Sequence, residues 1–330
     1  MCIDIFTHTM LCYGNKSALV VNDVPYTYAE ICAKMSSFSV SQSMLTIPNQ
    51  SVVALKGDYS LFYIMAFLIL CKKQCIIAPI LPQNIDIPLE DLGVEFILDT
   101  QDNITNTFNP KSHNLLNDLR KHNQSGLILF SSGSTGKPKA VVHNLNTLLK
   151  SYCNKTSNPL RIMSVYLPDH IAGIDVMLST LGSGGSLIIP QARNPQWILE
   201  SLQNHKVEVL PASPTLLRLL LIAGLGCYNL EHLKLVAYGS ERMNPKLLKS
   251  LQQALPHTKF KQSFGTSETS AIKTQQADKI LEKQGFEGFF KIINANYKIV
   301  NDILYLKSGT NALGYLNSDN SVFDNDGYFA

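Results

Sequence analysis

The sequence predicts an α/β fold in which helices cover mostly parallel sheets. From residue 127 onward, short apolar runs that read as strands alternate with stretches whose apolar residues recur at helical spacing. Repeated strand–helix–strand units of this kind favour a parallel sheet covered by helices. The first 125 residues read as a second α/β unit, and after residue 285 the pattern becomes that of a β-hairpin. We therefore expect three approximate parts, residues 1–125, 126–284 and 285–330.

The N-terminal part contains a continuously apolar stretch, residues 61–71. It is too short to cross a bilayer, which needs about 20 residues, and Lys72 and Lys73 interrupt it. We expect a buried helix that follows a strand at 52–55 and leads to a strand at 75–80, and no membrane span.

The central part supplies the expected sheet that positions a site. Its expected strands cover residues 127–130, 160–167, 187–190, 207–210, 233–238 and 259–264, and its expected helices cover 145–152, 171–181, 195–204, 214–223 and 245–255. Ligands of open parallel sheets bind outside the carboxyl ends of the strands. Five loops should therefore line one site: 131–139, 168–173, 211–214, 238–242 and 264–268.

The last part shows strand-like alternation. Tyr297, Ile299, Ile303 and Tyr305 alternate around an Asn-Asp pair at 301–302, which predicts a hairpin.

Composition narrows the class of protein. Of the 330 residues, 45% are hydrophobic and 16% are charged, as in a globular protein with a sizeable core. A net charge of +3 without a long basic run argues against nucleic acid as a main partner. The seven cysteines form no Cys-x-x-Cys pair and the chain starts without a secretory signal, so we expect reduced thiols and a cytoplasmic protein.

One loop carries the strongest functional signal. After the apolar run 127–130 come small, hydroxylated and cationic residues, and then an expected helix. The loop residues are Ser131, Ser132, Gly133, Ser134, Thr135, Gly136, Lys137 and, after a proline, Lys139. Glycines allow close backbone approach, successive N–H groups form an anion-binding nest, and the lysines add positive charge. The loop suits a polyphosphate; taken alone, a mobile Ser/Gly surface loop is the alternative.

A P-loop is excluded by spacing. That motif has four residues between its first glycine and a Gly-Lys pair, followed by Ser or Thr. Here Gly133 and Gly136 are three apart, and Pro138 follows Lys137.

The loop resembles the phosphate-binding signature of the adenylate-forming superfamily, which comprises acyl-CoA synthetases, adenylation domains of peptide synthetases and luciferases. That signature reads Thr-Ser-Gly-Thr-Thr-Gly-x-Pro-Lys-Gly, and this chain has Ser for Thr at two places and Ala140 for the last glycine. The resemblance implies an acyl-CoA-synthetase-like large domain: two stacked, mostly parallel α/β sheets and a small β-rich subdomain.

Three further segments are similar to motifs of the same superfamily. His170, within residues 168–173, matches a histidine beside the carboxylate site, although alone it reads as a helix cap. Residues 239–241 resemble a Gly-Gly-Glu loop that packs against adenine. Residues 264–268 resemble a Tyr-Gly-x-Thr-Glu segment. In that segment the tyrosine ring stacks on a purine, the threonine hydroxyl meets the α-phosphate and the glutamate carboxylate holds Mg²⁺. Asp175 is expected either near the pocket or at the surface.

The resemblance therefore implies a set of site residues. His170, Lys139 and Glu268 would be catalytic, with Glu268 also binding Mg²⁺. The ATP/AMP-binding residues would be Ser131, Ser132, Gly133, Ser134, Thr135, Gly136, Lys137, Gly239, Ser240, Glu241, Phe264, Gly265, Thr266 and Ser267.

The end of the chain resembles a segment that continues in relatives. Asp326, Gly327, Tyr328 and Phe329 are similar to Asp-Gly-Trp-x-x-Thr-Gly-Asp, whose last aspartate binds ribose and precedes a small C-terminal domain with a lysine that supports adenylation. We expect residues 1–330 to be an N-terminal adenylation domain without that small domain, so that the isolated chain adenylates poorly or not at all.

The implied activity is ATP-dependent activation of a carboxylic acid to an acyl-adenylate, followed by transfer to a thiol. ATP and Mg²⁺ would be required, and CoA or a phosphopantetheine would accept the acyl group. The implied partners are a small carboxylic acid and, with the second acceptor, an acyl carrier protein. The alternative is a truncated, non-catalytic homologue that binds nucleotide or acyl-adenylate. A generic phosphate-binding protein such as a kinase lacks supporting motifs.

Overall fold

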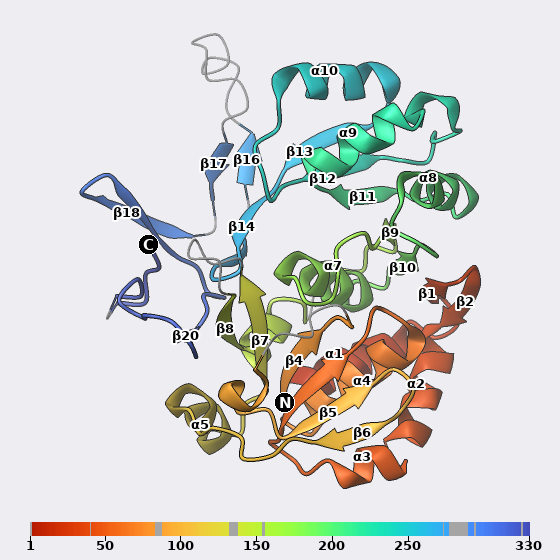
Figure 1. Cartoon of the computed structure of the whole chain (residues 1–330). Helices are drawn as coiled ribbons and strands as arrows, with labels where there is room; N and C mark the ends of the chain where they lie inside the picture. Colours follow the sequence, from red (N-terminus) through yellow and green to blue (C-terminus); the bar gives the residue numbers. More distant parts are fainter. Residues whose placement is uncertain are drawn as a thin grey trace.

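Two seven-stranded sheets form the framework of the computed structural model (Figure 1). The structure describes residues 2–39, 41–82, 88–131, 138–153, 156–272, 274–276, 290–293, 295–324 and 326–330. The expected α/β class with two mostly parallel sheets is confirmed.

The first sheet carries the strands that lead into the candidate site. In spatial order its strands are β13 (Lys259–Gln262), β12 (Leu235–Tyr238), β11 (Val209–Ala212), β9 (Arg161–Met163), β10 (Ser186–Ile189), β1 (Ser17–Val21) and β2 (Val24–Thr27). All neighbours are parallel except β1 and β2, which form an antiparallel edge. The expected strand at 160–167 is present only over its first part, as β9.

The second sheet has a parallel centre and antiparallel edges. In spatial order its strands are β20 (Gly314–Tyr315), β8 (Lys139–Asn144), β7 (Gly126–Ser131), β4 (Ile76–Ile80), β3 (Val52–Lys56), β5 (Phe96–Asp99) and β6 (Ile104–Asn106). Strands β7, β4, β3 and β5 are parallel neighbours, whereas β20, β8 and β7 pair antiparallel, as do β5 and β6.

Strand β8 corrects one prediction. The helix expected at 145–152 is present as α6 (Leu145–Lys150), but it does not follow the 131–139 loop directly, because Lys139–Asn144 first returns as a strand with Ser131 opposite Lys139. The β-branched Val141 and Val142 favour this strand, and both are buried, Val141 in a cluster with Ala312 and Tyr315 and Val142 in a cluster with Leu116 and Leu119. The candidate phosphate loop therefore joins two antiparallel strands.

Each of the two sheets contains strands from both sides of the expected boundary between residues 125 and 126. Strands β1 and β2 belong to the same sheet as residues 161–262, while β7 and β8 belong to the sheet built mostly from residues 52–106. The boundary between residues 125 and 126 therefore does not separate the two sheets.

Helices cover both sheets. The helices are α1 (Cys2–Cys12), α2 (Tyr28–Phe38), α3 (Gln42–Thr46), α4 (Leu61–Lys72), α5 (Asn114–Lys121), α6 (Leu145–Lys150), α7 (Ile171–Gly182), α8 (Pro195–Asn204), α9 (Pro214–Ile222) and α10 (Pro245–Ala254), with 3₁₀ turns η1 (Glu90–Leu92) and η2 (Leu225–Cys227). Helices α8, α9 and α10 each begin with proline in the first turn, after a capping Asn or Ser side chain.

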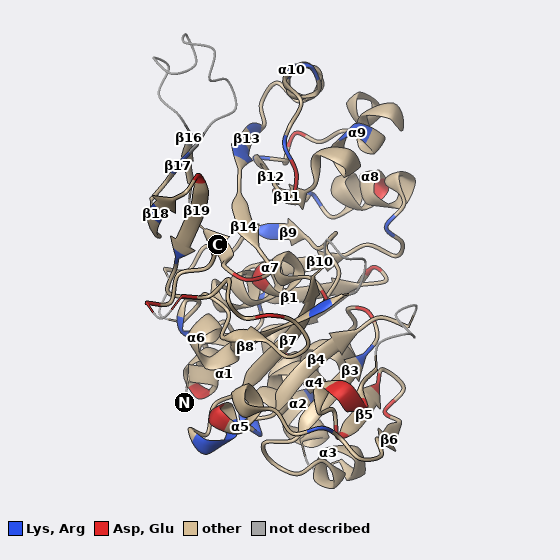
Figure 2. Ribbon diagram, turned by 60° about the vertical axis from the view of Figure 1, so that its left-hand side comes forward, with Lys and Arg blue, Asp and Glu red and all other residues tan. Residues whose placement is uncertain are grey.

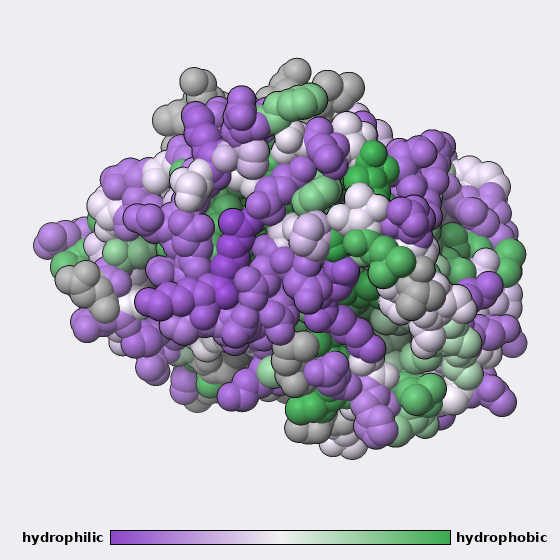
Figure 3. Space-filling model, turned by 90° about the horizontal axis from the view of Figure 1, so that it is seen from below, coloured by the Kyte–Doolittle hydropathy of each residue, from purple (hydrophilic) through white to green (hydrophobic). Residues whose placement is uncertain are grey.

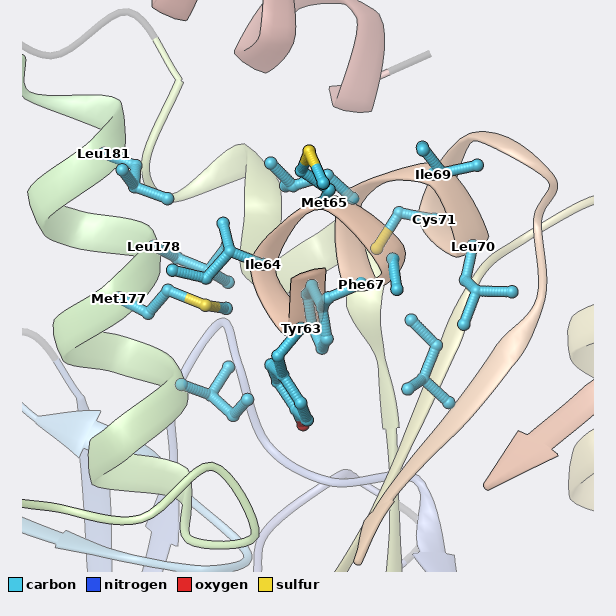
Figure 4. Close-up of a cluster of buried hydrophobic side chains, with 14 of the residues drawn as sticks. Tyr63, Ile64, Met65, Phe67, Ile69, Leu70, Cys71, Met177, Leu178 and Leu181 are labelled. Atoms are coloured by element: carbon cyan, nitrogen blue, oxygen red, sulfur yellow. The ribbon is translucent and has the colours of Figure 1, made fainter. Parts of the chain in front are cut away.

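One core lies between the sheets, and α4 is at its centre. Nine of the twelve α4 residues are buried, which confirms the expected buried helix, since a helix that is apolar on every side is buried. Figure 4 shows Met177, Leu178 and Leu181 of α7 pointing toward this cluster. Separate clusters pack the outer face of each sheet against α8, α9 and α10, or against α5. Helix α7 is thus held rigidly from its inner side.

Three antiparallel strand pairs follow the first sheet in the part of the chain that the structure describes. They pair β14 (Phe264–Thr266) with β15 (Ser270–Ile272), β16 (Thr274–Gln276) with β17 (Phe290–Ile292), and β18 (Asn296–Val300) with β19 (Ile303–Lys307). The last is the expected hairpin, and its turn residues Asn301 and Asp302 both have positive φ, as a tight two-residue turn requires.

Positions of Lys and Arg and positions of Asp and Glu are interspersed along the ribbon in Figure 2. On the face seen in Figure 3, hydrophilic side chains cover most of the surface, with smaller hydrophobic areas between them. Among the described residues, no helix is both long and apolar enough to cross a membrane.

Candidate active site

Four of the five loops expected to line one site meet at a pocket of about 230 Å³. They follow β9, β11, β12 and β13, which are parallel neighbours, so their carboxyl ends lie at one edge of the first sheet. The contributing loop residues are His170, Ala172, Pro211, Ser240, Phe264 and Gly265. The pocket therefore lies where the sheet topology predicts a ligand.

The fifth loop, residues 131–139, belongs to the second sheet. Ser131 ends β7 and Lys139 begins β8, and the two lie opposite one another. The side chain of Asn317 holds the end of this loop, because its Nδ2 donates to the Pro138 carbonyl at 3.0 Å and its Oδ1 accepts from the Ala140 N–H at 2.8 Å. Ser132, Gly133, Ser134, Thr135, Gly136 and Lys137 lie outside the described residues, so their phosphate contacts stay a prediction.

Beside this loop, Tyr315 of the second sheet contacts both Lys139 and Glu268, which lies in the turn between β14 and β15. The Tyr315 hydroxyl donates to Oε1 of Glu268 at 2.8 Å, and Lys139 Nζ lies 5.1 Å from the centroid of the Tyr315 ring. Both Glu268 and Tyr315 are buried. Burial and the Glu268 carboxylate raise the pKa of Tyr315 well above its usual range, so the phenol remains a hydrogen-bond donor at neutral pH.

Glu268 fits a single-carboxylate Mg²⁺ site. Its bond to Tyr315 leaves Oε2 for a metal ion, and Mg²⁺ commonly uses one or two carboxylates together with waters and substrate phosphates. Within the described ranges, no cluster of three or more His, Cys, Asp or Glu side chains could hold a metal by protein ligands alone. A cation here would therefore depend on phosphate oxygens.

The turn that presents Glu268 is held by threonine hydroxyls. Oγ1 of Thr266 accepts from the backbone N–H groups of Glu268 and Thr269, both at 3.2 Å. Gly265 precedes this turn, and a Cβ there would lie 2.3 Å from the Ser270 carbonyl oxygen. Only glycine fits that position without a backbone shift.

His170 caps helix α7 at the mouth of the pocket. Its Nδ1 accepts from the Ala172 N–H at 3.1 Å, so the hydrogen of the neutral ring lies on Nε2. The ring stacks on Tyr166, with centroids 5.7 Å apart and planes 18° apart. Desolvation lowers the pKa of His170, while the Asp169 carboxylate acts in the opposite direction. The His170 side chain thus both caps α7 and lines the pocket.

The 238–242 loop contributes only part of its expected set to the pocket. Ser240 lines the pocket and has a positive φ of 70°. Gly239 packs tightly beneath, because a Cβ there would lie 2.5 Å from Ser263 Oγ. Glu241 points elsewhere: its Oε1 accepts from the Thr215 N–H at 2.8 Å at the start of α9, which lowers the pKa of Glu241.

His143, which the sequence did not indicate as a site residue, contacts the loop that carries Glu268. Its Nε2 lies 2.6 Å from the Ser267 carbonyl oxygen, and burial lowers its pKa to about 4. A lone histidine in an apolar strand gives no signal for such a role. The sequence predicted Asp175 either near the pocket or at the surface, and the structure places it in the lining of the pocket.

A family model described as "AMP-binding enzyme" matches residues 6–316. The chain belongs to this family. Among relatives of the AMP-binding enzyme family, a 2-succinylbenzoate–CoA ligase of Staphylococcus epidermidis is 28% identical, over 96% of this chain and 71% of the ligase. A nonribosomal peptide synthetase of Emericella nidulans, easA, is 23% identical, over 90% of this chain and 5% of that much longer protein.

Solved structures of other proteins share the fold. The N-terminal domain of FACL13 from Mycobacterium tuberculosis, with a bound inhibitor, matches with a TM-score of 0.80 at 16% identity, over 99% of this chain and 94% of that one. O-succinylbenzoate coenzyme A synthetase from Bacillus subtilis, in complex with AMP, matches with a TM-score of 0.77 at 17% identity, over 98% and 93% of the two chains. These likenesses confirm the expected fold.

Proposed function

We propose that this protein activates a small carboxylic acid with ATP, forming an acyl-adenylate and pyrophosphate. The observation that carries the proposal is the convergence of four strand-end loops on one pocket, beside the chain formed by Lys139, Tyr315 and Glu268. Family membership supports the same reaction class, since relatives include a CoA ligase and a nonribosomal peptide synthetase.

The proposed reaction is an in-line displacement. A carboxylate oxygen of the acid attacks the α-phosphorus of ATP, and the bond from that phosphorus to the bridging oxygen breaks, so pyrophosphate leaves with the electron pair. The protein contributes mainly by positioning the reactants and stabilising charge. In this proposal Lys139 and the hydroxyls and N–H groups of residues 131–137 bind the phosphates. Mg²⁺, when bound at Glu268, supplies further positive charge to them.

The remaining site residues have proposed binding roles. Phe264 stacks on the purine, while Gly239, Ser240 and Gly265 allow it to approach the backbone. Thr266 and Ser267 meet the α-phosphate. Glu241 would act indirectly, because it holds the start of α9. His170 contacts the acid carboxylate through Nε2–H, which its Nδ1 bond to the backbone leaves pointing outward from the cap.

The second half of the proposal is transfer of the acyl group to a thiol. The thiolate of CoA or of a carrier-protein phosphopantetheine attacks the acyl carbon, and AMP leaves. The choice between these acceptors is decided by supplying each to preformed acyl-adenylate and detecting the thioester by mass spectrometry.

Acid-dependent exchange of labelled pyrophosphate into ATP tests the activation step. We expect the full-length protein to show exchange with at least one acid of a broad panel, and a large loss in Lys139→Ala. Lys111→Ala is the matched control, because Lys111 pairs with Asp91 at the surface. Exchange with no acid would overturn the proposal; tight binding of an acyl-adenylate analogue without exchange would support the non-catalytic alternative.

A further inference from the structure

A tight turn between β9 and α7 brings Tyr166 beside His170. The His170 N–H donates to the Leu167 carbonyl at 3.2 Å, which closes a turn with Pro168 in its second position. Proline is favoured there because its φ is already fixed near the value that the turn needs. The first turn of α7 packs on the same backbone, since a Cβ at Gly173 would lie 2.0 Å from the Leu167 carbonyl oxygen. The local sequence thus holds the two rings beside each other, with centroids 5.7 Å apart.

Two contacts of different kinds act on the His170 ring. The hydrogen bond from the Ala172 N–H to Nδ1, at 3.1 Å, fixes one atom of the ring, but the ring can still turn about that bond. The Tyr166 ring lies within 18° of the imidazole plane, and this stacking restricts the rotation. With Nδ1 and the plane of the ring both set, the direction of the Nε2–H bond is set as well.

Tyr166 is itself anchored to the core. It is partly buried and packs against the apolar cluster between the first sheet and helices α8, α9 and α10. Burial raises the pKa of Tyr166, and the Ser240 side chain, which interacts with the phenol hydroxyl, partly offsets this shift. Tyr166, His170 and Ser240 all line the same pocket. The phenol thus connects the loop that carries His170 with the loop that carries Ser240.

We propose that Tyr166 is a positioning residue, whose ring holds His170 in the orientation that directs Nε2–H to the acid carboxylate. This inference rests on the proposed acid activation, in which His170 contacts that carboxylate. The aromatic ring of Tyr166 carries the effect, because stacking on an imidazole needs a flat aromatic face. Tyr166 acts through His170, so its loss affects the use of the acid and has no effect once the imidazole is absent.

Two substitutions separate the ring from the hydroxyl. Tyr166→Phe and Tyr166→Leu both lose the hydroxyl that meets Ser240, and only Tyr166→Phe keeps an aromatic face. Pyrophosphate exchange by the full-length protein is measured against the concentration of an acid that the wild type activates. The kcat/KM for this acid should be roughly 2- to 13-fold lower in Tyr166→Leu than in Tyr166→Phe, the range for an aromatic pair, with the same KM for ATP in both. Tyr297→Leu, which removes an exposed ring from β18, is the matched control and should keep the wild-type kcat/KM.

The same pair of substitutions in a second background tests whether Tyr166 acts through His170. His170→Asn removes the imidazole but keeps a side chain that caps a helix well. In this background Tyr166→Phe and Tyr166→Leu should give equal kcat/KM for the acid, because no ring is left to position and the coupling between the two sites is lost. A difference that persists in the His170→Asn background would show that Tyr166 acts on the acid directly, and it would overturn the inference.

A spectroscopic measurement distinguishes failure of this inference from failure of acid activation. Carbon-13 relaxation of histidine-labelled protein gives the order parameter of the His170 ring, and the signals missing in His170→Asn identify this ring among the eight histidines. The order parameter should fall toward about 0.6, where groups are flexible, in Tyr166→Leu but not in Tyr166→Phe. Equal order parameters in the two variants would overturn the positioning role. A ring released only in Tyr166→Leu, without exchange for any acid, would support the positioning of His170 and overturn only the acid activation.

Discussion

Lowering the pH should destabilise the folded protein by protonating His143, whose ring contacts the loop that carries Glu268. The ring is 1% exposed, and its Nε2 lies 2.6 Å from the Ser267 carbonyl oxygen. Because a carbonyl only accepts, Nε2 carries the hydrogen of the neutral ring, and the charged ring would need a second hydrogen on buried Nδ1. Burial lowers the pKa to about 4, against the opposing effects of the Ser267 and Thr310 carbonyls and the Glu268 carboxylate.

The sign and size of the effect follow from this pKa. The unfolded chain, with a histidine pKa near 6.5, binds the proton more readily than the folded chain, so stability rises with pH across this interval. The contribution is complete above about pH 6.5 and is lost as the pH falls toward 4. At 1.36 kcal/mol per pH unit, the loss is roughly 3 kcal/mol.

Urea unfolding between pH 4 and pH 7.5 measures this loss. His143→Gln removes the titrating ring but keeps a neutral N–H that can donate to the Ser267 carbonyl. The stability of the wild type should fall by roughly 3 kcal/mol more than that of His143→Gln over this range. His122→Gln, at the exposed end of α5, is the matched control and should follow the wild-type profile. Parallel profiles for wild type and His143→Gln would refute the reasoning.

Three further changes probe the same loop. Tyr315→Phe should cost roughly 1.5–3 kcal/mol in urea unfolding, because the buried Glu268 carboxylate loses its donor; an unchanged stability would contradict this. Glu268→Gln should raise the Mg²⁺ concentration needed for half-maximal exchange, and an unaltered Mg²⁺ titration would argue against metal binding there. Gly265→Ala should cost roughly 1–3 kcal/mol because its Cβ meets the Ser270 carbonyl. Gly309→Ala, where the new Cβ has no neighbour within 4 Å, should cost less, so equal stabilities would count against the close approach.

Local signals made much of the fold predictable. Helices α8, α9 and α10 combine a capping side chain, a proline in the first turn and an apolar stripe, and each lies within a residue or so of its expected range. The apolar run that forms α4 has no polar face, which predicts burial. Strand β8 escaped prediction, because its apolar run Ala140, Val141 and Val142 is too short to reveal its period.

The order of strands and loops also predicted where the site lies, since parallel strands bring their carboxyl ends to one edge. The partners within the site could not be predicted in the same way. The contact between His143 and Ser267 spans 124 residues, and that between Glu268 and Tyr315 spans 47. Such pairings depend on how segments that are distant in the sequence pack against each other. No local sequence pattern encodes that packing. The position of Asp175 on the pocket side of α7 likewise depends on which face the core occupies.

We propose that ATP and a carboxylic acid meet at the carboxyl edge of the first sheet, in the pocket beside α7. A crystal structure of this protein with a non-hydrolysable acyl-adenylate analogue tests it most directly. We expect the adenine beside Gly239 and Phe264, the phosphate mimic near Lys139, and the acyl group in the pocket along α7. An analogue bound at another place, with this pocket empty, would contradict the account.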